Sequence, residues 1–117
     1  MATDRPKKGG VGMLPAMTEK DWQKQVVDLA KILGWRVYHP FLSKWSEKGW
    51  PDLALVRERV VYAELKRENG KVSPSQVEWI YALTAAGQEV YVWRPSDFDE
   101  VARILQHRQT PEKEGER

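Results

Sequence analysis

The chain has 117 residues, enough for one domain of ordinary size with one hydrophobic core. Hydrophobic residues make up 41% and charged residues 31% of it, fractions that exclude a fibrous or wholly disordered protein. It has no cysteine and two histidines, which excludes disulfides, thiolate zinc sites, cysteine nucleophiles and histidine metal cages. No apolar run is long enough to cross a bilayer, so we expect a cytoplasmic protein with no membrane partner.

The formal net charge of +2 is not spread along the chain. Residues 1–17 carry three basic residues and one acid, whereas residues 18–107 carry 13 of each kind. We therefore expect a flexible basic tail at 1–17, a folded domain at 18–107 and a flexible polar tail at 108–117. Charge alone is a weak argument for a nucleic-acid partner, and any bound metal must be a hard cation held by oxygen ligands.

The first half of the domain predicts a helix and three strands. Thr18 is a good N-cap for a helix that ends at Gly34, and the residues 35–39 form a short strand closed by Pro40. Two strands, 52–56 and 60–66, then form a hairpin around a three-residue turn. If Val56 pairs with Val60, Asp52 lies beside Glu64.

This register sorts the hairpin side chains onto two faces, because successive residues of a strand point to opposite sides. One face is wholly apolar and carries Leu53, Leu55, Val61, Ala63 and Leu65. The other face carries Asp52, Tyr62, Glu64 and Lys66, with Tyr62 expected to pack under the first helix.

The second half of the domain predicts helix, strand and helix. Ser73-Pro74 opens a helix that ends at Gly87, residues 89–93 form a strand, and Ser96 caps the last helix. The apolar stripe expected for the first of these helices contains Val77, Ile80, Tyr81 and Thr84, broadened by Trp79 and Leu83. The order α-β-β-β-α-β-α predicts a three-layer α/β fold with a central mixed four-stranded sheet.

Asp52 and Glu64 give the polar face a chemical role. Two carboxylates paired across strands repel, and a divalent cation such as Mg²⁺ resolves the repulsion because it takes one or two carboxylates as ligands. Lys66 lies on the same face, where its ammonium can hold an attacking water or stabilise developing negative charge. The backbone carbonyl of Leu65 is a further candidate ligand.

Pro51-Asp52, followed after eleven residues by Glu64-Leu65-Lys66, resembles the motif of the PD-(D/E)xK nucleases. Residues 18–106 as a whole resemble a stand-alone VRR-NUC domain, as found in phage proteins and Fanconi-associated nucleases. The segments that carry this resemblance are GWRVYH, KGWPDLALV, AELKRENGKVSPSQ and VYVWRPSDFDEV. The resemblance implies a restriction-endonuclease-like core and, for a phage gene, location in the host cytoplasm.

The resemblance also implies a Mg²⁺- or Mn²⁺-dependent deoxyribonuclease that hydrolyses phosphodiester bonds with a metal-activated water. It implies Asp52 and Glu64 as metal ligands together with the Leu65 carbonyl, and Glu19 as a further acid acting through water. The implied catalytic set is Glu19, Asp52, Glu64, Lys66 and Gln76. A symmetric homodimer acting on branched DNA, like a Holliday-junction resolvase, is implied as well, with DNA contacts expected from Lys44, Lys48, Trp50 and Ser75.

Structural roles compete with several of these functional ones. Glu19 suits the first turn of a helix through the macrodipole, and Gln76 lies three residues after Ser73, as in a capping box. His39 either reaches the site or merely ends its strand. At the level of the whole chain, the alternatives are a non-catalytic nucleic-acid-binding module on the same scaffold and a sequence-specific, restriction-type nuclease.

Overall fold

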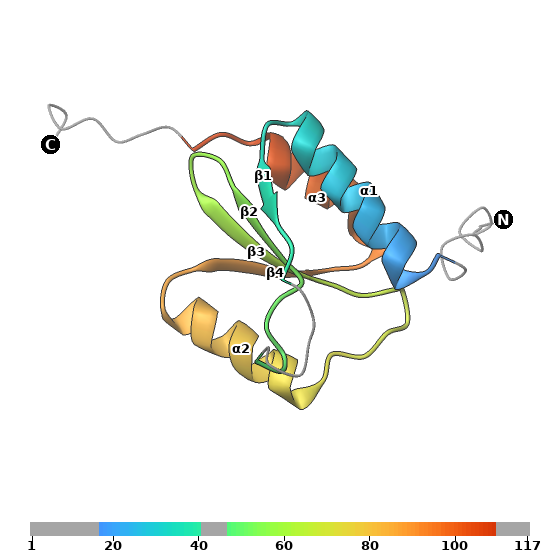
Figure 1. Ribbon diagram of the computed structural model, residues 1–117, viewed down its shortest axis with the longest axis vertical. Coiled ribbons are helices and arrows are strands. Elements are labelled where there is room, and N and C mark those ends of the chain that lie inside the picture. Colours follow the sequence, from blue (N-terminus) through green and yellow to red (C-terminus); the bar gives the residue numbers. More distant parts are fainter. Residues whose placement is uncertain (1–16, 41–46, 110–117) are drawn as a thin grey trace, which may run out of the picture.

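A computed structural model describes residues 17–40 and 47–109 of the chain. The predicted order of elements is confirmed, with a short 3₁₀ turn added before the last helix (Figure 1). The elements are α1 (Glu19–Ile32), β1 (Arg36–Tyr38), β2 (Leu53–Val56), β3 (Val60–Leu65), α2 (Pro74–Ala85), β4 (Glu89–Trp93), η2 (Pro95–Asp97) and α3 (Phe98–Gln106). The predicted tails at 1–17 and 108–117 and the predicted DNA contact Lys44 lie wholly or mostly outside the described residues.

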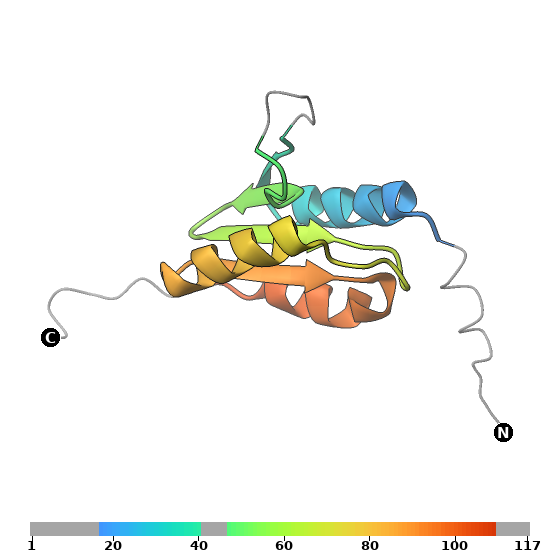
Figure 2. The ribbon, with the colours of Figure 1, turned by 90° about the horizontal axis from the view of Figure 1, so that it is seen from below.

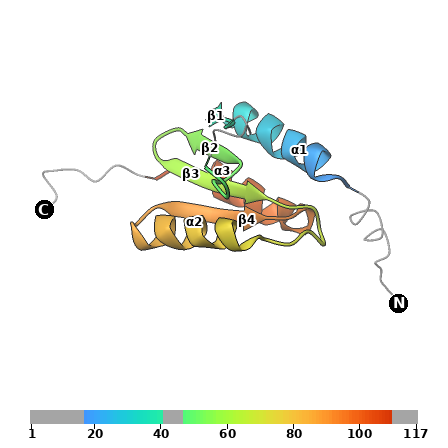
Figure 3. The same cartoon turned by 60° about the horizontal axis from the view of Figure 1, so that its bottom comes forward.

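The four strands form one mixed sheet in the order β1-β2-β3-β4. The first two pairings are antiparallel, whereas β3 and β4 run parallel because α2 connects them as a crossover. Helices α1 and α3 cover one face of the sheet and α2 covers the other, as Figures 2 and 3 show from two further directions. The three-layer architecture expected from the sequence is therefore confirmed.

The main core lies between the sheet and the pair α1 and α3. The predicted register is confirmed, since Val56 pairs with Val60 and Leu53 with Ala63, and the five apolar side chains of this hairpin face are all fully buried. Two tryptophans lock the helices to the strands, because the Trp22 indole donates to the Trp93 carbonyl at 2.9 Å and the Trp35 indole to the Leu105 carbonyl at 3.0 Å. The helix residues of this core are Trp22, Val26, Ala30, Val101 and Leu105.

The half-buried face of α2 is only partly the predicted one, since it includes the predicted Trp79, Ile80 and Leu83 but not Val77, Tyr81 and Thr84. Val77 and Tyr81 are 52% and 75% exposed, and no residue of α2 is fully buried. The half-buried residues of α2 are Ser75, Gln76, Trp79, Ile80 and Leu83, the last four at the spacing i, i+3, i+4, i+7. The helix is turned this way because Gln76 bonds to Glu64 and the Trp79 indole donates to the Lys48 carbonyl at 3.1 Å.

Two smaller expectations are wrong for identifiable reasons. Ser96 does not cap α3, because Asp97 accepts the Arg94 amide and folds Pro95–Asp97 into η2, so that α3 begins at Phe98. Tyr62 does not pack under α1. It faces the α2 side of the sheet, where it meets the edge of Trp50. None of the described helices has the length and apolar character needed to cross a membrane.

The turn between β2 and β3 is tied to the ends of both helices on the core side. Arg57 donates to the carbonyls of Leu33 and Leu105 at 2.9 and 3.0 Å and stacks on the Trp35 ring. Arg59 donates to the Ile104 carbonyl and forms an ion pair with Glu89. Since the last carbonyls of a helix lack partners within it, these guanidinium groups act as C-terminal caps supplied by another element.

We expect Arg57→Ala to lower the free energy of unfolding by about 2–3 kcal/mol, because several carbonyls lose a charged donor. The control is Arg103→Ala, since Arg103 is largely exposed and its pair with Glu100 is a surface contact that is expected to matter by less than about 1 kcal/mol. Urea denaturation of both variants measures the difference. Equal losses would contradict the capping role of Arg57.

Candidate active site

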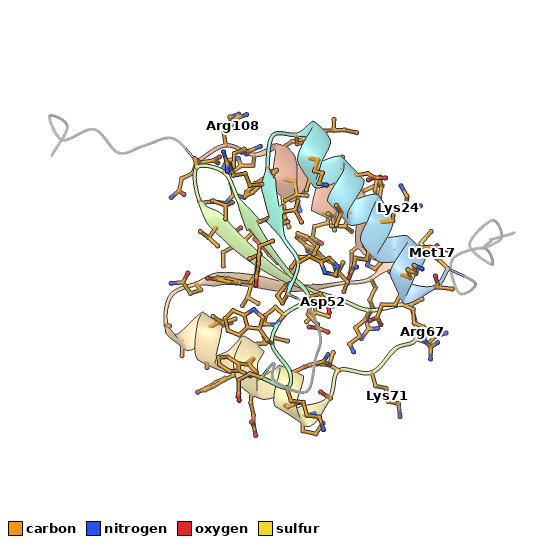
Figure 4. The ribbon with its side chains drawn as sticks, viewed as in Figure 1. Met17, Lys24, Asp52, Arg67, Lys71 and Arg108 are labelled. Atoms are coloured by element: carbon orange, nitrogen blue, oxygen red, sulfur yellow. The ribbon has the colours of Figure 1, made fainter. Side chains whose placement is uncertain are left out.

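The polar face of the hairpin brings the predicted acids together at one end of the sheet. Asp52 directly precedes β2 and Glu64 is the next-to-last residue of β3. Figure 4 places Asp52 near the middle of the molecule, where the chain enters the sheet. The Glu64 side chain is only 1% exposed, which is unusual for a carboxylate and requires compensating partners.

Each of these acids has defined contacts. Asp52 Oδ2 accepts the backbone N–H of Leu65 at 2.8 Å, and Glu64 Oε2 accepts the Gln76 side-chain amide at 2.6 Å. The Lys66 ammonium lies 3.7 Å from the same Glu64 oxygen. Glu64 Oε1 is buried and finds no hydrogen-bond partner among the described residues. The pair therefore keeps one buried oxygen with unused acceptor capacity.

These surroundings favour the protonated form of Glu64. Burial raises the pKa of Glu64 to about 8, and the neighbouring negative charge of Asp52 adds to the rise. Lys66 opposes it as a nearby positive charge. A positive charge placed beside Glu64 would restore the ionised form, which is the effect expected of a bound cation.

Gln76 completes the capping box that its sequence position predicts, and it also contacts Glu64. Its backbone N–H donates to the Ser73 hydroxyl, and its side-chain oxygen accepts the Ser73 N–H at 2.8 Å, which completes a capping box. Its side-chain nitrogen remains free to donate to Glu64. The start of α2 thus fixes the amide in the orientation that holds the buried carboxylate.

The segment before Asp52 is held against the start of α2. Gly49 has a φ of +92°, and a Cβ there would lie 2.5 Å from the main chain of Ser75, so only glycine fits. Trp50 packs edge-on against Tyr62 and Trp79. Three of the residues predicted to bind DNA lie here. Ser75 and Trp50 are half-buried where this segment meets α2, and Lys48 is exposed.

The loop from β3 to α2 is anchored just beyond Lys66. The Arg94 guanidinium donates to the carbonyls of Arg67, Glu68 and Gly70 at distances between 2.7 and 3.2 Å. The Glu68 carboxylate in turn accepts the Ser96 amide. The end of β3 is thereby tied to the chain that leaves β4.

Glu19 lies at the rim of the same region. It lines, with Asp52, a pocket of about 450 Å³ between α1 and the chain entering β2. The pocket also contains Gln23, Tyr38 and His39, whose place at the site the sequence interpretation missed or left open. Gln23 follows Glu19 by one helical turn, a spacing that would have placed it on the same side of α1.

The donor set fits a hard divalent cation. Among the described residues no group of three or more His, Asp or Glu side chains converges on one point. A cation such as Mg²⁺ does not need one, because it keeps several waters and takes one or two carboxylates. Asp52 and Glu64 supply two carboxylates, and Glu64 Oε1 has no hydrogen-bond partner among the described residues.

Comparison with known proteins identifies the domain. The family model of the VRR-NUC domain matches residues 16–97, most of the chain. The chain belongs to the VRR-NUC family. Two solved structures agree, each with a TM-score of 0.63. The first, a "VRR_NUC domain protein", is 24% identical in sequence, and the match covers 77% of this chain and 86% of that chain. The second, a "VRR_NUC domain", is 29% identical, and the match covers 79% of this chain and 98% of that chain. No curated protein sequence matches the chain.

The VRR-NUC domain is a nuclease domain of the PD-(D/E)xK type, a hydrolase module whose substrate is DNA. Nucleases of this family typically use a divalent metal. The acidic pair and the lysine described above lie within the matched residues. The fold of the two solved relatives is the one seen here, a mixed sheet between helical layers.

The raised pKa of Glu64 predicts how the stability of the metal-free VRR-NUC domain depends on pH. Between about pH 4.5 and pH 8 the folded state holds a proton that the unfolded state has released, so stability falls as the pH rises. We expect the melting temperature in EDTA to fall over this range and Glu64→Gln to flatten the slope. Exposed Glu78→Gln, the matched control, should leave the slope unchanged, and an unchanged slope in Glu64→Gln would refute the assignment.

Gly49→Ala tests how the VRR-NUC domain positions Asp52. Gly87 has a similar φ of +84° with nothing within 4 Å of its would-be Cβ, so Gly87→Ala carries the backbone cost alone, about 1 kcal/mol. We expect Gly49→Ala to cost about 1–3 kcal/mol more, because its Cβ meets the main chain of Ser75. Urea denaturation compares the two, and equal losses would show that the close contact is unimportant.

Proposed function

We propose that the protein is a Mg²⁺- or Mn²⁺-dependent, structure-selective DNA endonuclease resembling a Holliday-junction resolvase. The observation that carries this proposal is the buried Glu64 carboxylate beside Asp52, with one oxygen lacking a partner among the described residues. Burying such a pair without a cation is unfavourable, and a binding site for one explains why the fold retains it. We further propose that residues 18–107 form the nuclease domain and that residues 1–17 and 108–117 are flanking tails.

Asp52 and Glu64 are the proposed metal ligands, with the Leu65 carbonyl as a third and Glu19 contributing through an intervening water. A divalent cation held there lowers the pKa of water and offsets the negative charge of the phosphate. The Leu65 N–H bond to Asp52 keeps this carboxylate beside β3, and the Gln76 amide fixes the rotamer of Glu64. Both acids are thus preoriented by neighbouring elements.

Lys66 is the proposed catalytic lysine. Its side chain is mostly buried and its ammonium can donate hydrogen bonds but cannot ligate a cation. Within reach of Glu64, it favours the ionised form of that acid and can orient a water or stabilise charge on the reacting phosphate. Gln76 acts through Glu64 and is a positioning residue.

The proposed DNA surface lies around the start of α2. Exposed Lys48 and the first turn of α2 at Ser75 lie on either side of the Gly49 contact, and Trp50 borders the pocket. The proposed contact Lys44 belongs to the same connection between β1 and β2. A lysine side chain and a helix N-terminus both suit phosphate oxygens.

The proposed active form is a symmetric homodimer. One two-fold axis would present two identical sites to the two strands of a branched junction, whereas one domain of this size carries a single site. The corresponding location is the cytoplasm, or the host cytoplasm for a phage gene. The alternative, a non-catalytic module that binds nucleic acid on the same scaffold, would keep the fold and the DNA affinity without a metal-dependent reaction.

We expect the full-length protein to make paired symmetric cuts in a four-way junction in Mg²⁺ or Mn²⁺ and none in EDTA. Asp52→Asn and Lys66→Met should each lower the cleavage rate at least about 100-fold, because the first weakens the binding of the cation and the second removes a positive charge at the reacting phosphate. The assay compares labelled junction, flap, duplex and single-stranded DNA.

Exposed Glu78→Gln and Lys31→Met serve as charge-matched controls and should cut like the parent protein. Junction binding without cleavage in any metal would favour the non-catalytic module. Cleavage at one fixed sequence in plain duplex would favour a restriction-type enzyme, and single unpaired nicks would contradict the dimer.

A further inference from the structure

The pocket beside Asp52 is lined by several residues that have no role in the proposed metal chemistry. Its volume is about 450 Å³, within the range of pockets that bind small molecules. Only Asp52 and Glu19 among its lining residues belong to the proposed catalytic set. The remainder includes two aromatic rings, Tyr38 and Trp50, and the polar pair Gln23 and His39.

Two aromatic rings line the pocket, one held in place and one largely exposed. Trp50 is fixed by edge-on contacts with Tyr62 and Trp79, with ring centroids 5.9 and 4.8 Å away. Tyr38 is 64% exposed at the end of the edge strand β1, so most of its ring is available to a ligand. Flat aromatic walls suit a planar ring, because stacking gains contact on both faces.

The charges around the pocket disfavour an anion inside it. Among the described residues, three carboxylates, those of Glu19, Glu47 and Asp52, line the pocket together with one ammonium, that of Lys20. A phosphate group would be repelled there, whereas a neutral planar group would not. The side chains of Gln23 and His39 are hydrogen-bonded to each other and offer donors and acceptors to the polar edge of such a group.

Asp52 belongs both to the pocket and to the acidic pair, so the two sites share a wall. A DNA strand with its phosphate at Asp52 and Glu64 would have its adjoining sugar and base near that wall. A base paired and stacked in a duplex cannot enter a pocket, whereas an unpaired base at a branch point enters with little unstacking cost.

We propose that this pocket receives one unpaired nucleobase next to the phosphate that is cut, stacked against Tyr38 and Trp50. The proposal rests on the proposed nuclease function and deepens it by naming the substrate feature that the site reads. Selectivity against plain duplex then arises within one domain, because a duplex offers no free base beside a scissile phosphate, whereas a flap, an opened branch point or a single strand does.

The test is a double-mutant cycle between Tyr38 and the base. Flap and junction substrates are made with one abasic site placed in turn at each nucleotide around the branch point. Affinity is measured by fluorescence anisotropy in Ca²⁺, and cleavage is measured separately in Mg²⁺. For the parent protein we expect one position where base removal weakens binding roughly tenfold.

Tyr38→Ala should bind the intact substrate roughly tenfold more weakly and lose nothing further at that abasic position. Tyr81→Ala, which removes another largely exposed tyrosine, from α2, should behave like the parent protein. If base removal has the same effect in the parent and in Tyr38→Ala at every position, the pocket proposal is wrong even where cleavage is normal. A cycle that couples in Ca²⁺ without cleavage in Mg²⁺ supports the pocket and refutes the nuclease function.

Discussion

The pairing register of β2 and β3 is the constraint on which the rest of the structure depends. Leu53 opposite Ala63 sends the apolar residues toward α1 and α3, and leaves Glu64 on the opposite face next to Asp52. A slip by one residue would reverse both faces and bury charges in the main core. The two arginines of the hairpin turn also stabilise this register. Arg57 and Arg59 donate hydrogen bonds to backbone carbonyls at the ends of the two core helices.

The two faces of the sheet differ in how they are packed. The α1 and α3 side contains all the fully buried helix residues, so most of the stabilisation by apolar burial comes from there. The α2 side carries a buried carboxylate and a helix with no fully buried residue. Gln76 and Trp79 orient that helix by hydrogen bonds to Glu64 and to the Lys48 carbonyl, so polar contacts as well as packing set its position.

Much of this arrangement could be predicted from sequence because it is local. The hairpin register follows from alternation and a short turn, and the capping box at Ser73 follows from spacing within four residues. The face of α2 could not be predicted, since apolar residues occur all around it and contacts distant in sequence choose among them. Arg57 and Arg59 likewise resemble solvated turn residues until the helix ends they cap are in place.

The segment from Gly49 to Asp52 joins the two halves of the proposed site. Gly49 contacts the main chain at the start of α2, and Trp50 lines the pocket. Buried Pro51 directly precedes Asp52, whose carboxylate is a proposed metal ligand. These four consecutive residues therefore set the distance between the proposed base pocket and the proposed phosphate position at the acidic pair. Gly49 is held by its contact with α2, and Asp52 is held by its hydrogen bond from the Leu65 N–H of β3. This distance is therefore determined by α2 and the sheet and not by the flexibility of a loop.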